Sequence, residues 1–154
     1  MRKGRSLVAV LDSKTYKLIE WHLFHYFDLR RQVVEYEDRR KAISDSSRAQ
    51  FTGGGHGVSF RSDPTATKTL DLFDLAAEYQ ESKAETWVMV IEQVIARYEG
   101  SPKGKLLELK YFGDMSDDFI QDRLNIERAT YFRWRNELVI YTALVAACNG
   151  LIEV

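Results

Sequence analysis

Apolar residues recur three and four positions apart along most of this 154-residue chain, and only two prolines interrupt the pattern. That spacing gathers apolar side chains on one face of an α-helix, whereas a half-buried strand would alternate apolar and polar residues. Each proline follows a residue that caps helices well, Asp63 or Ser101, and proline at the first helical position loses no hydrogen bond. A strand-like pattern competes only at residues 7–11. The sequence therefore predicts an all-α fold.

The glycines and prolines divide the chain into two expected regions. An N-terminal region of long helices is expected over residues 1–99, with a Gly- and Ser-rich loop at 44–62. A helix-turn-helix region is expected over residues 100–154, because Gly100 supplies a C-terminal stop for the preceding helix. The expected helices cover residues 13–43, 63–98 with a break near 80–83 left open, 101–113, 116–124, and a final one that starts at 128.

The charge of the chain is almost balanced, with 22 Lys and Arg against 23 Asp and Glu and a formal net charge of -1. This balance argues against a histone-like or polybasic protein that holds nucleic acid by bulk charge, but it leaves room for a local basic site. Apolar residues make up 45% of the chain, which is enough for a hydrophobic core and excludes wholesale disorder.

The chain begins with basic residues like those of an export signal, but the apolar run behind them, residues 7–11, is short and ends at Asp12. No stretch reaches the roughly 18 uninterrupted apolar residues that a membrane helix needs. Cys148 is the only cysteine, so the sequence holds no disulfide framework. We therefore expect a soluble protein in the cytoplasm, with no membrane as partner.

The segment from Ser116 onwards has the pattern of a helix-turn-helix. Ser116 is a good N-cap, and the two acids after it suit the positive end of a helix. Residues 125–127 predict a tight turn in which Ile126 is buried, and a second helix begins at Arg128. Two short helices joined in this way form the motif that places its second helix in the major groove of DNA.

The helical period sorts the side chains of this second helix. If Tyr131 and Trp134 turn inward, residues 128–136 present three arginines and no acid on the outer face and its edges. Arginine pairs well with guanine, asparagine pairs well with adenine, and threonine or lysine can contact phosphates. The residues expected to contact DNA are Arg128, Ala129, Thr130, Phe132, Arg133, Arg135, Asn136 and, from the helix expected at 101–113, Lys110.

The spacing alone suits an ordinary α-hairpin with a charged outer face equally well. Two strings of residues favour DNA binding. Residues 124–135, LNIERATYFRWR, resemble the recognition segment of the RinA/ArpU family of phage transcriptional regulators, which is similar in that part to region 4 of sigma factors. Residues 53–65, GGGHGVSFRSDPT, resemble the stretch that this family places between an N-terminal helix and a long central one.

The resemblance spans nearly the whole chain and implies a function. Members of the family bind promoter DNA and work with host RNA polymerase to activate phage genes, notably late operons for packaging and morphogenesis. By position, the recognition-helix roles would fall to Arg128, Ala129, Phe132 and Arg133. The chain departs from the family at Gln121, where a small residue is usual, and at Glu127, where a Ser or Thr cap is usual. A carboxylate caps a helix poorly and repels phosphate.

No set of residues in the sequence points to catalysis, a metal or a cofactor. His22 and His25 lie three apart but lack an evident third ligand, and residues 53–57 lack the G-K-[ST] ending of a phosphate loop. The acids Asp117, Asp118 and Asp122 are better explained as a solvated helix face than as catalytic carboxylates. We therefore expect neither enzyme activity nor a bound cofactor.

The partners that the sequence indicates are of two kinds. Double-stranded promoter DNA in a bacterial host cell is the expected partner, with host RNA polymerase as a second candidate. The balanced charge would also suit a helical protein-interaction or assembly module that does not bind DNA. A homodimer would double a short DNA site, and the helices expected at residues 13–43 and 70–98 could either form its interface or pack within one monomer.

Overall fold

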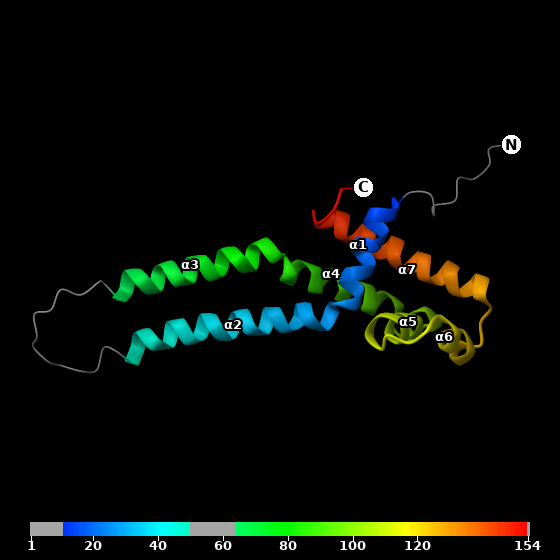
Figure 1. The fold of residues 1–154 in the computed structure, drawn as a ribbon, viewed down its shortest axis with the longest axis horizontal. Coiled ribbons are helices and arrows are strands. Elements are labelled where there is room, and N and C mark those ends of the chain that lie inside the picture. The colour runs from blue at the N-terminus through cyan, green and yellow to red at the C-terminus, as the bar shows by residue number, and fades with distance from the viewer. Residues whose placement is uncertain (1–10, 50–63, 154) are drawn as a thin grey trace, which may run out of the picture. The chain divides into compact units, whose positions relative to one another are not determined.

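The computed structural model of the protein describes residues 11–49 and 64–153, and every regular element in those ranges is a helix (Figure 1). This confirms the prediction of an all-α fold. Within the same ranges, no helix combines the length and the hydrophobicity that a membrane crossing requires. The elements are α1 (Ser13–Phe24), α2 (Tyr26–Ala49), α3 (Pro64–Ser82), α4 (Ala84–Tyr98), α5 (Pro102–Leu107), the π-helical turn η3 (Glu108–Phe112), α6 (Asp117–Leu124) and α7 (Arg128–Cys148).

The contacts divide the chain into two compact units, which we call the first and the second unit. Of the described residues, the first unit takes those up to Leu29 and those from Glu85 onwards, and the second unit takes Arg30–Ala84. Helix α1 belongs with the C-terminal helices because it packs against α7 and η3. The boundary that the sequence suggested between residues 99 and 100 therefore does not coincide with the boundary between the units.

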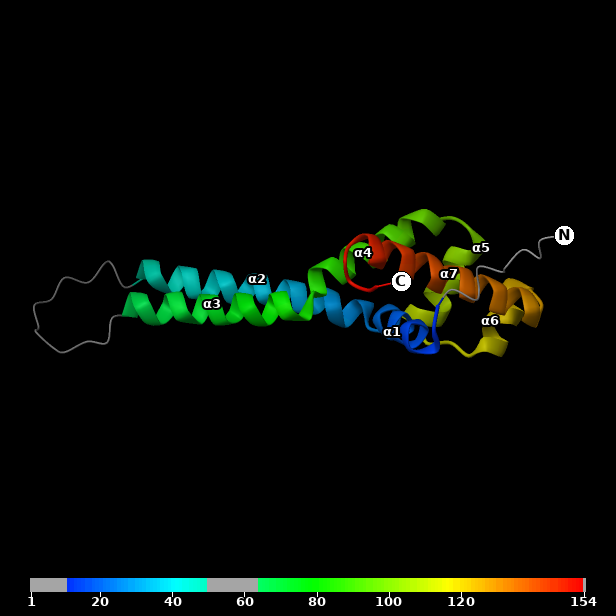
Figure 2. The same cartoon turned by 90° about the horizontal axis from the view of Figure 1, so that it is seen from above.

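The core of the first unit is built from one apolar stripe of each of its helices. The three-four spacing along each helix puts these side chains on one face, and the faces meet. Helix α5 packs against α6 and α7, and α1 packs against α7 on another side (Figure 2). The fully buried side chains include Ile19, Leu23, Val90, Ile91, Val94, Leu106, Ile120, Tyr131 and Leu138.

The single long helix expected over residues 13–43 is wrong, because His25 interrupts it. Helix α1 ends at Phe24 and α2 begins at Tyr26. The Nδ1 atom of His25 lies 2.7 Å from the carbonyl oxygen of Trp21, which also accepts the His25 backbone N–H at 3.1 Å. The imidazole thus shares a helical acceptor with its own backbone N–H at the residue between the two helices.

The other helix ends follow local signals, with one exception. Helix α2 continues to Ala49, so residues 44–49 of the expected loop are helical, while residues 50–62 lie outside the described residues. Helix α3 begins at Pro64 as predicted, although the expected cap Asp63 also lies outside them. The break left open near residues 80–83 is real, since Lys83 separates α3 from α4 with a left-handed φ of 51°.

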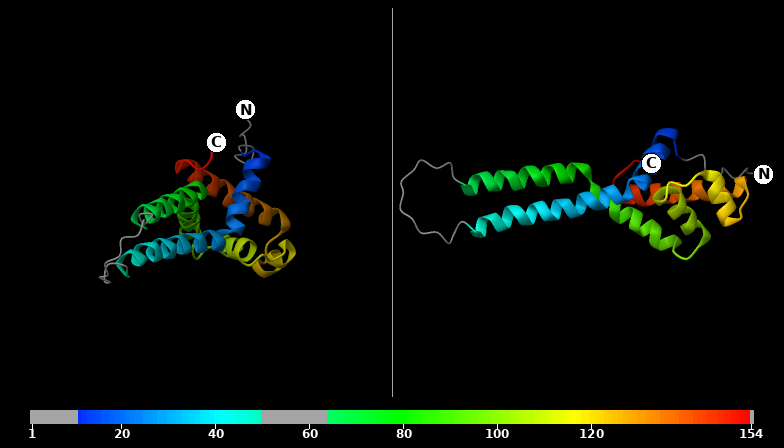
Figure 3. Two further views of the ribbon diagram at one scale, coloured as in Figure 1. Left: turned by 60° about the vertical axis from the view of Figure 1, so that its left-hand side comes forward. Right: turned by 60° about the horizontal axis from the view of Figure 1, so that its bottom comes forward.

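The second unit is a pair of helices. The part of α2 from Arg30 onwards and α3 run antiparallel and side by side, as the further views agree (Figure 3). Tyr36 of α2 stacks on Tyr79 of α3 with ring centroids 3.9 Å apart. None of the side chains described between residues 30 and 83 is buried, so this pair has no closed core of its own.

Candidate nucleic-acid interface

Helix α6 and the turn that follows it form as the sequence predicts. The Ser116 hydroxyl accepts the backbone N–H of Phe119 at 3.3 Å, which caps the helix. Asn125 ends α6 in the left-handed conformation with a φ of 51°. Asparagine tolerates that conformation better than most residues because its short side chain is polar. The N–H of Ile126 then donates to the carbonyl oxygen of Gln121 at 3.0 Å, which closes the turn.

Helix α7 begins at Arg128 after the three-residue turn. Glu127 occupies the N-cap position and makes no side-chain hydrogen bond there, in line with the poor capping expected of a carboxylate. Ile126 is half-buried, whereas the sequence predicts a buried residue there. On the inner face of α7, Tyr131 is fully buried and Trp134 is half-buried. The helix-turn-helix geometry is therefore present, with a partly open turn.

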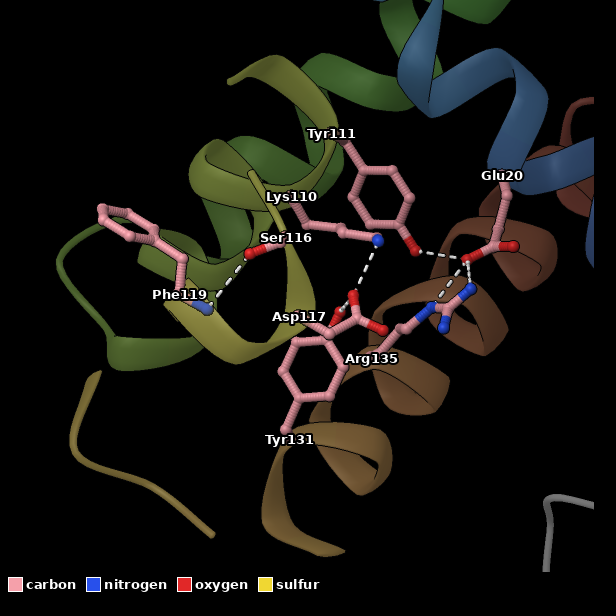
Figure 4. A network of polar contacts seen from close by, with 8 residues as sticks. All are labelled: Glu20, Lys110, Tyr111, Ser116, Asp117, Phe119, Tyr131 and Arg135. Atoms are coloured by element: carbon pink, nitrogen blue, oxygen red, sulfur yellow. Dashed lines mark hydrogen bonds and ion pairs between the residues drawn. The ribbon is translucent and has the colours of Figure 1, made fainter. Parts of the chain in front are cut away.

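Arg135 is held by helix α1 rather than presented to the outside (Figure 4). Its Nε and Nη2 atoms lie 2.8 Å and 2.6 Å from one carboxylate oxygen of Glu20. The Tyr111 hydroxyl donates to the same oxygen at 2.9 Å. Only 21% of the Arg135 side chain and 14% of the Glu20 side chain are exposed. Burial disfavours the charged guanidinium, but the bonds to Glu20 outweigh burial and raise the pKa of Arg135.

Asn136 is also engaged by α1. The Tyr16 hydroxyl donates to Asn136 Oδ1 at 2.7 Å, which occupies the oxygen that a bidentate contact to adenine would need. Burial first, and then the nearby Glu20 carboxylate, raise the pKa of Tyr16 to about 12, although Arg135 opposes the shift. Two of the residues predicted to contact DNA, Arg135 and Asn136, thus fasten α7 to the first helix of the chain.

Lys110 is paired inside the first unit as well. Its Nζ atom lies 2.7 Å from Asp117 Oδ1, and the Tyr131 hydroxyl donates to the same oxygen (Figure 4). Burial opposes the charge on Asp117, but the bonds from Lys110 and Tyr131 hold the pKa of that carboxyl below its ordinary value. Lys110 is thus not a free phosphate contact, and Asp117 ties η3, α6 and α7 together.

The π-helical turn η3 brings these partners into place. The backbone N–H of Gly113 donates to the carbonyl oxygen of Glu108 at 2.8 Å, five residues earlier, which is the hydrogen bond of a π-helix. Lys110 and Tyr111 lie in this widened turn, where Lys110 reaches α6 and Tyr111 reaches α1. Burial first, and then the adjacent Glu20 carboxylate, raise the pKa of Tyr111 far above its ordinary value.

The residues left on the outer face lie in the first two turns of α7. Arg128, Ala129 and Arg133 are exposed, while Thr130 and Phe132 are half-buried. The Arg128 guanidinium carbon lies 5.4 Å from the centroid of the Phe132 ring, a cation–π arrangement that restrains an otherwise mobile side chain. These five residues, which we call the α7 face, are the part of the predicted DNA-contacting set that the structure keeps accessible.

A surface hollow of about 340 Å³ borders the α7 face. It is lined by Lys110, Ser116, Asp117, Asp118, Gln121, Arg128 and Phe132. Gln121 stands where the family resembled in sequence places a small residue, and it lies on the rim of this space. Asp118 and Asp122 are exposed as expected of a solvated helix face, and Asp118 places an acidic side chain in the hollow beside Arg128.

Sequence reasoning missed Glu20, Tyr16 and Tyr111, although they decide which residues of α7 are accessible. Glu20 is 115 positions away from Arg135, and Tyr16 is 120 positions away from Asn136. No local signal links such pairs. Both histidines make packing contacts: the His22 ring of α1 stacks on Trp87 with centroids 3.6 Å apart, and the His25 ring, directly after α1, stacks on Trp21 at 4.0 Å. Among the described residues, no three metal-ligating side chains gather.

Comparison with known proteins gives one family. Residues 74–145 match the family described as "Protein of unknown function (DUF1492)". The matched stretch begins within α3 and includes the whole helix-turn-helix and most of α7. No curated protein and no solved structure gave a match.

Proposed function

We propose that this protein is a sequence-specific DNA-binding transcriptional regulator that places the N-terminal half of α7 in the major groove. The observation that carries the proposal is the α7 face, which follows a capped helix and a three-residue turn. Arg128 and Arg133 are exposed there, and the first two turns of α7 contain no acid. The later polar residues Arg135 and Asn136 are bound to α1 and brace the helix instead.

Each member of the α7 face has a distinct role in this proposal. Arg133 is the residue best suited to donate two hydrogen bonds to a guanine edge, since it is exposed. Arg128, restrained over Phe132, would contact a guanine or a phosphate near the start of the helix. Ala129 is small enough for close approach of the helix to the base edges and can contact a thymine methyl group.

The acidic side chains around the α7 face weaken binding to DNA of any sequence, so in this proposal the protein discriminates between sequences more than it binds tightly. Asp118, which lines the hollow beside Arg128, and Glu127, which directly precedes α7, are exposed and repel phosphates, so the net attraction for DNA of any sequence is small. Binding would then depend on base contacts more than on backbone contacts. This agrees with a chain whose formal net charge is only -1.

The biological role in this proposal comes from the sequence resemblance. The strings at residues 124–135 and 53–65 resemble the RinA/ArpU family, whose members activate phage late genes together with host RNA polymerase. We extend that role to this protein as an activator of packaging and morphogenesis genes in a bacterial host cell.

The proposal is tested by selecting bound DNA from a random pool and measuring affinity for the selected sequence at moderate salt. The substitution Arg133→Ala should weaken that binding by about 1–3 kcal/mol, or roughly 5- to 150-fold, and should relax the preference at one base position. Arg31→Ala is the matched control, because Arg31 is equally exposed but lies on α2. A wild-type protein that binds no sequence better than random DNA would refute the proposal.

A second candidate function is a helical protein-interaction module. Several large apolar side chains of the first unit are exposed, including Trp21, Phe27 and Phe119, and such surfaces suit protein partners. Salt dependence separates the two candidates, because each phosphate contact adds about 0.9 to the slope of log affinity against log salt concentration. Salt-dependent DNA binding, even with a slope of only about one or two units, would exclude the module, whereas a protein complex without any DNA binding would support it.

A further inference from the structure

Helix α3 carries two apolar stripes, and only one of them faces α2. Leu72, Ala76 and Tyr79 form the first stripe and are half-buried, with Tyr79 stacked on Tyr36 of α2. The second stripe, which we call the α3 seam, has the same alternation of four and three positions and is exposed throughout. The α3 seam consists of Ala66, Leu70, Phe73 and Ala77.

The α3 seam lies on a different side of the helix from the first stripe. Residues on an α-helix are rotated by about 100° per position, which separates the centres of the two stripes by more than a third of a turn. Leu70 and Phe73 are 63% and 68% exposed, and no other helix of the second unit covers them. A helix with two such repeats is typical of a bundle in which it has neighbours on two sides.

The second unit is incomplete as a folded body without another layer. None of its side chains described between residues 30 and 83 is buried. Paired helices gain most of their stability from burying an apolar face, and one pair alone provides little burial. A hollow of about 490 Å³, lined by residues of both helices that include Tyr36, Leu72 and Phe73, lies beside the α3 seam. This hollow offers room for side chains of a further helix.

The charged residues on either side of the α3 seam indicate which partner could cover it. The helical period places Asp74 and Glu81 along one edge of the α3 seam, next to Leu70 and Ala77. Across this hollow, helix α2 carries Arg40, which lines it, and the neighbouring Lys41, whereas Arg39 lines a separate hollow with Asp71, Asp74 and Glu78. One chain therefore supplies both an acidic edge and a basic edge on either side of one apolar surface.

We propose that the α3 seam is the interface of a homodimer, in which two copies of the α2–α3 pair form a four-helix bundle. A two-fold axis makes the same patch contact itself, so the acidic edge of α3 in one copy meets Arg40 and Lys41 of α2 in the other. Opposite charges at the flanks of an apolar seam fix the partner and the orientation, as they do in coiled coils. A second copy of the chain supplies both an apolar surface to cover the α3 seam and charges that complement its edges.

Sedimentation equilibrium of the full chain without DNA tests this proposal. Wild type should be mainly dimeric at about 10 µM protein. This concentration lies above the low-micromolar or tighter dissociation constant that we expect for the dimer. Leu70→Glu should weaken self-association by at least about 100-fold, because each dimer loses two buried leucines. Leu144→Glu is the matched control, since Leu144 is 52% exposed but lies on α7 in the first unit, and it should leave the dimer unchanged.

A charge-swap series guards against simple misfolding of the Leu70 variant. Asp74→Lys with Glu81→Lys should weaken the dimer, Arg40→Glu with Lys41→Glu should weaken it too, and the combination of all four should restore it. Circular dichroism checks that helical content is retained in each variant. A monomeric wild type, a dimer that survives Leu70→Glu, or no recovery in the combined variant overturns the proposal. DNA is absent from these measurements, so their failure would leave the proposed function untouched.

Discussion

Replacing Arg135 with alanine should destabilise the first unit and leave the α7 face able to read DNA. Arg133, two positions earlier, should show the opposite pattern. The sequence assigns both arginines to DNA, whereas the structure binds Arg135 to Glu20 and exposes Arg133. The two variants therefore separate the role of bracing α7 from the role of contacting bases.

The size of the effect follows from the contacts of Arg135. The substitution removes two hydrogen bonds to a carboxylate, at 2.8 Å and 2.6 Å, and such charged hydrogen bonds contribute about 1.5–3 kcal/mol each at most. It also leaves Glu20, with 14% of its side chain exposed, without its cation. Breaking a fully buried pair costs about 3–5 kcal/mol, and partial exposure of this one reduces the expected loss to about 2–4 kcal/mol. For a chain of this size, that lowers Tm by roughly 4–16 °C.

The assay is thermal unfolding followed by circular dichroism, together with binding to the selected DNA. Arg135→Ala should show the fall in Tm and keep the base preference of wild type. Arg133→Ala should keep the wild-type Tm, because exposed substitutions change stability by about 0.5 kcal/mol or less. The double variant Glu20→Leu with Arg135→Leu should recover part of the loss, since no charge is then left unpaired. An Arg135→Ala Tm equal to that of wild type, or an equal fall for Arg133→Ala, would refute this reasoning.

Two pH-dependent effects follow from the remaining contacts. The pKa of Asp117 is lowered in the folded protein, so its carboxylate stabilises the fold at any pH above the ordinary carboxyl pKa of about 3.9. This stabilisation is lost as pH falls through the lower pKa of the folded state. Asp117→Asn should therefore be less stable than wild type at pH 7, and acid denaturation curves should show this difference shrinking below about pH 4. Burial first, and then His25, lower the pKa of His22, so its contribution is present above about pH 6.5 and is lost as pH falls below that value. Protonation of the partly buried ring should then destabilise the first unit and change the fluorescence of Trp87, and His22→Phe should abolish that acid step; an unchanged step in this variant would contradict the assignment.

Much of the fold could be predicted because its signals are local. Ser101 and Ser116 cap helices with their own side chains, and Asn125 adopts the left-handed conformation that closes the turn before α7. Each of these residues acts on backbone atoms a few positions away, so the sequence order alone reveals the contact. The helix-turn-helix is therefore the part of the fold that the sequence predicts best.

The accessible part of the α7 face could not be predicted in the same way. Helical period correctly placed Arg128, Ala129 and Arg133 outside, but it could not show that α1 covers the next turn of α7. That covering depends on the Glu20–Arg135 contact, which joins residues 115 positions apart. Periodicity describes one helix at a time, whereas accessibility depends on which other helix is packed against it.

The extent of α2 shows a second kind of limit. Ser44, Asp45 and Ser46 belong to a polar stretch that favours a loop by composition. In the structure the helix runs through them, and the Ser46 hydroxyl donates to the Ile43 carbonyl oxygen at 2.9 Å. A serine that bonds back to its own helix satisfies its hydroxyl without ending the helix. Composition alone does not distinguish this arrangement from a turn.

The π-helical turn η3 makes the length of its segment matter more than its composition. A π-turn holds one residue more than an α-turn, so deleting any residue of Glu108–Phe112 would return it to α geometry. The widened turn from which Lys110 reaches Asp117 and Tyr111 reaches Glu20 would then be lost. Substitutions here should therefore be tolerated far better than deletions. Among relatives of this chain, we expect the number of residues between the caps Ser101 and Ser116 to stay fixed while their identities drift.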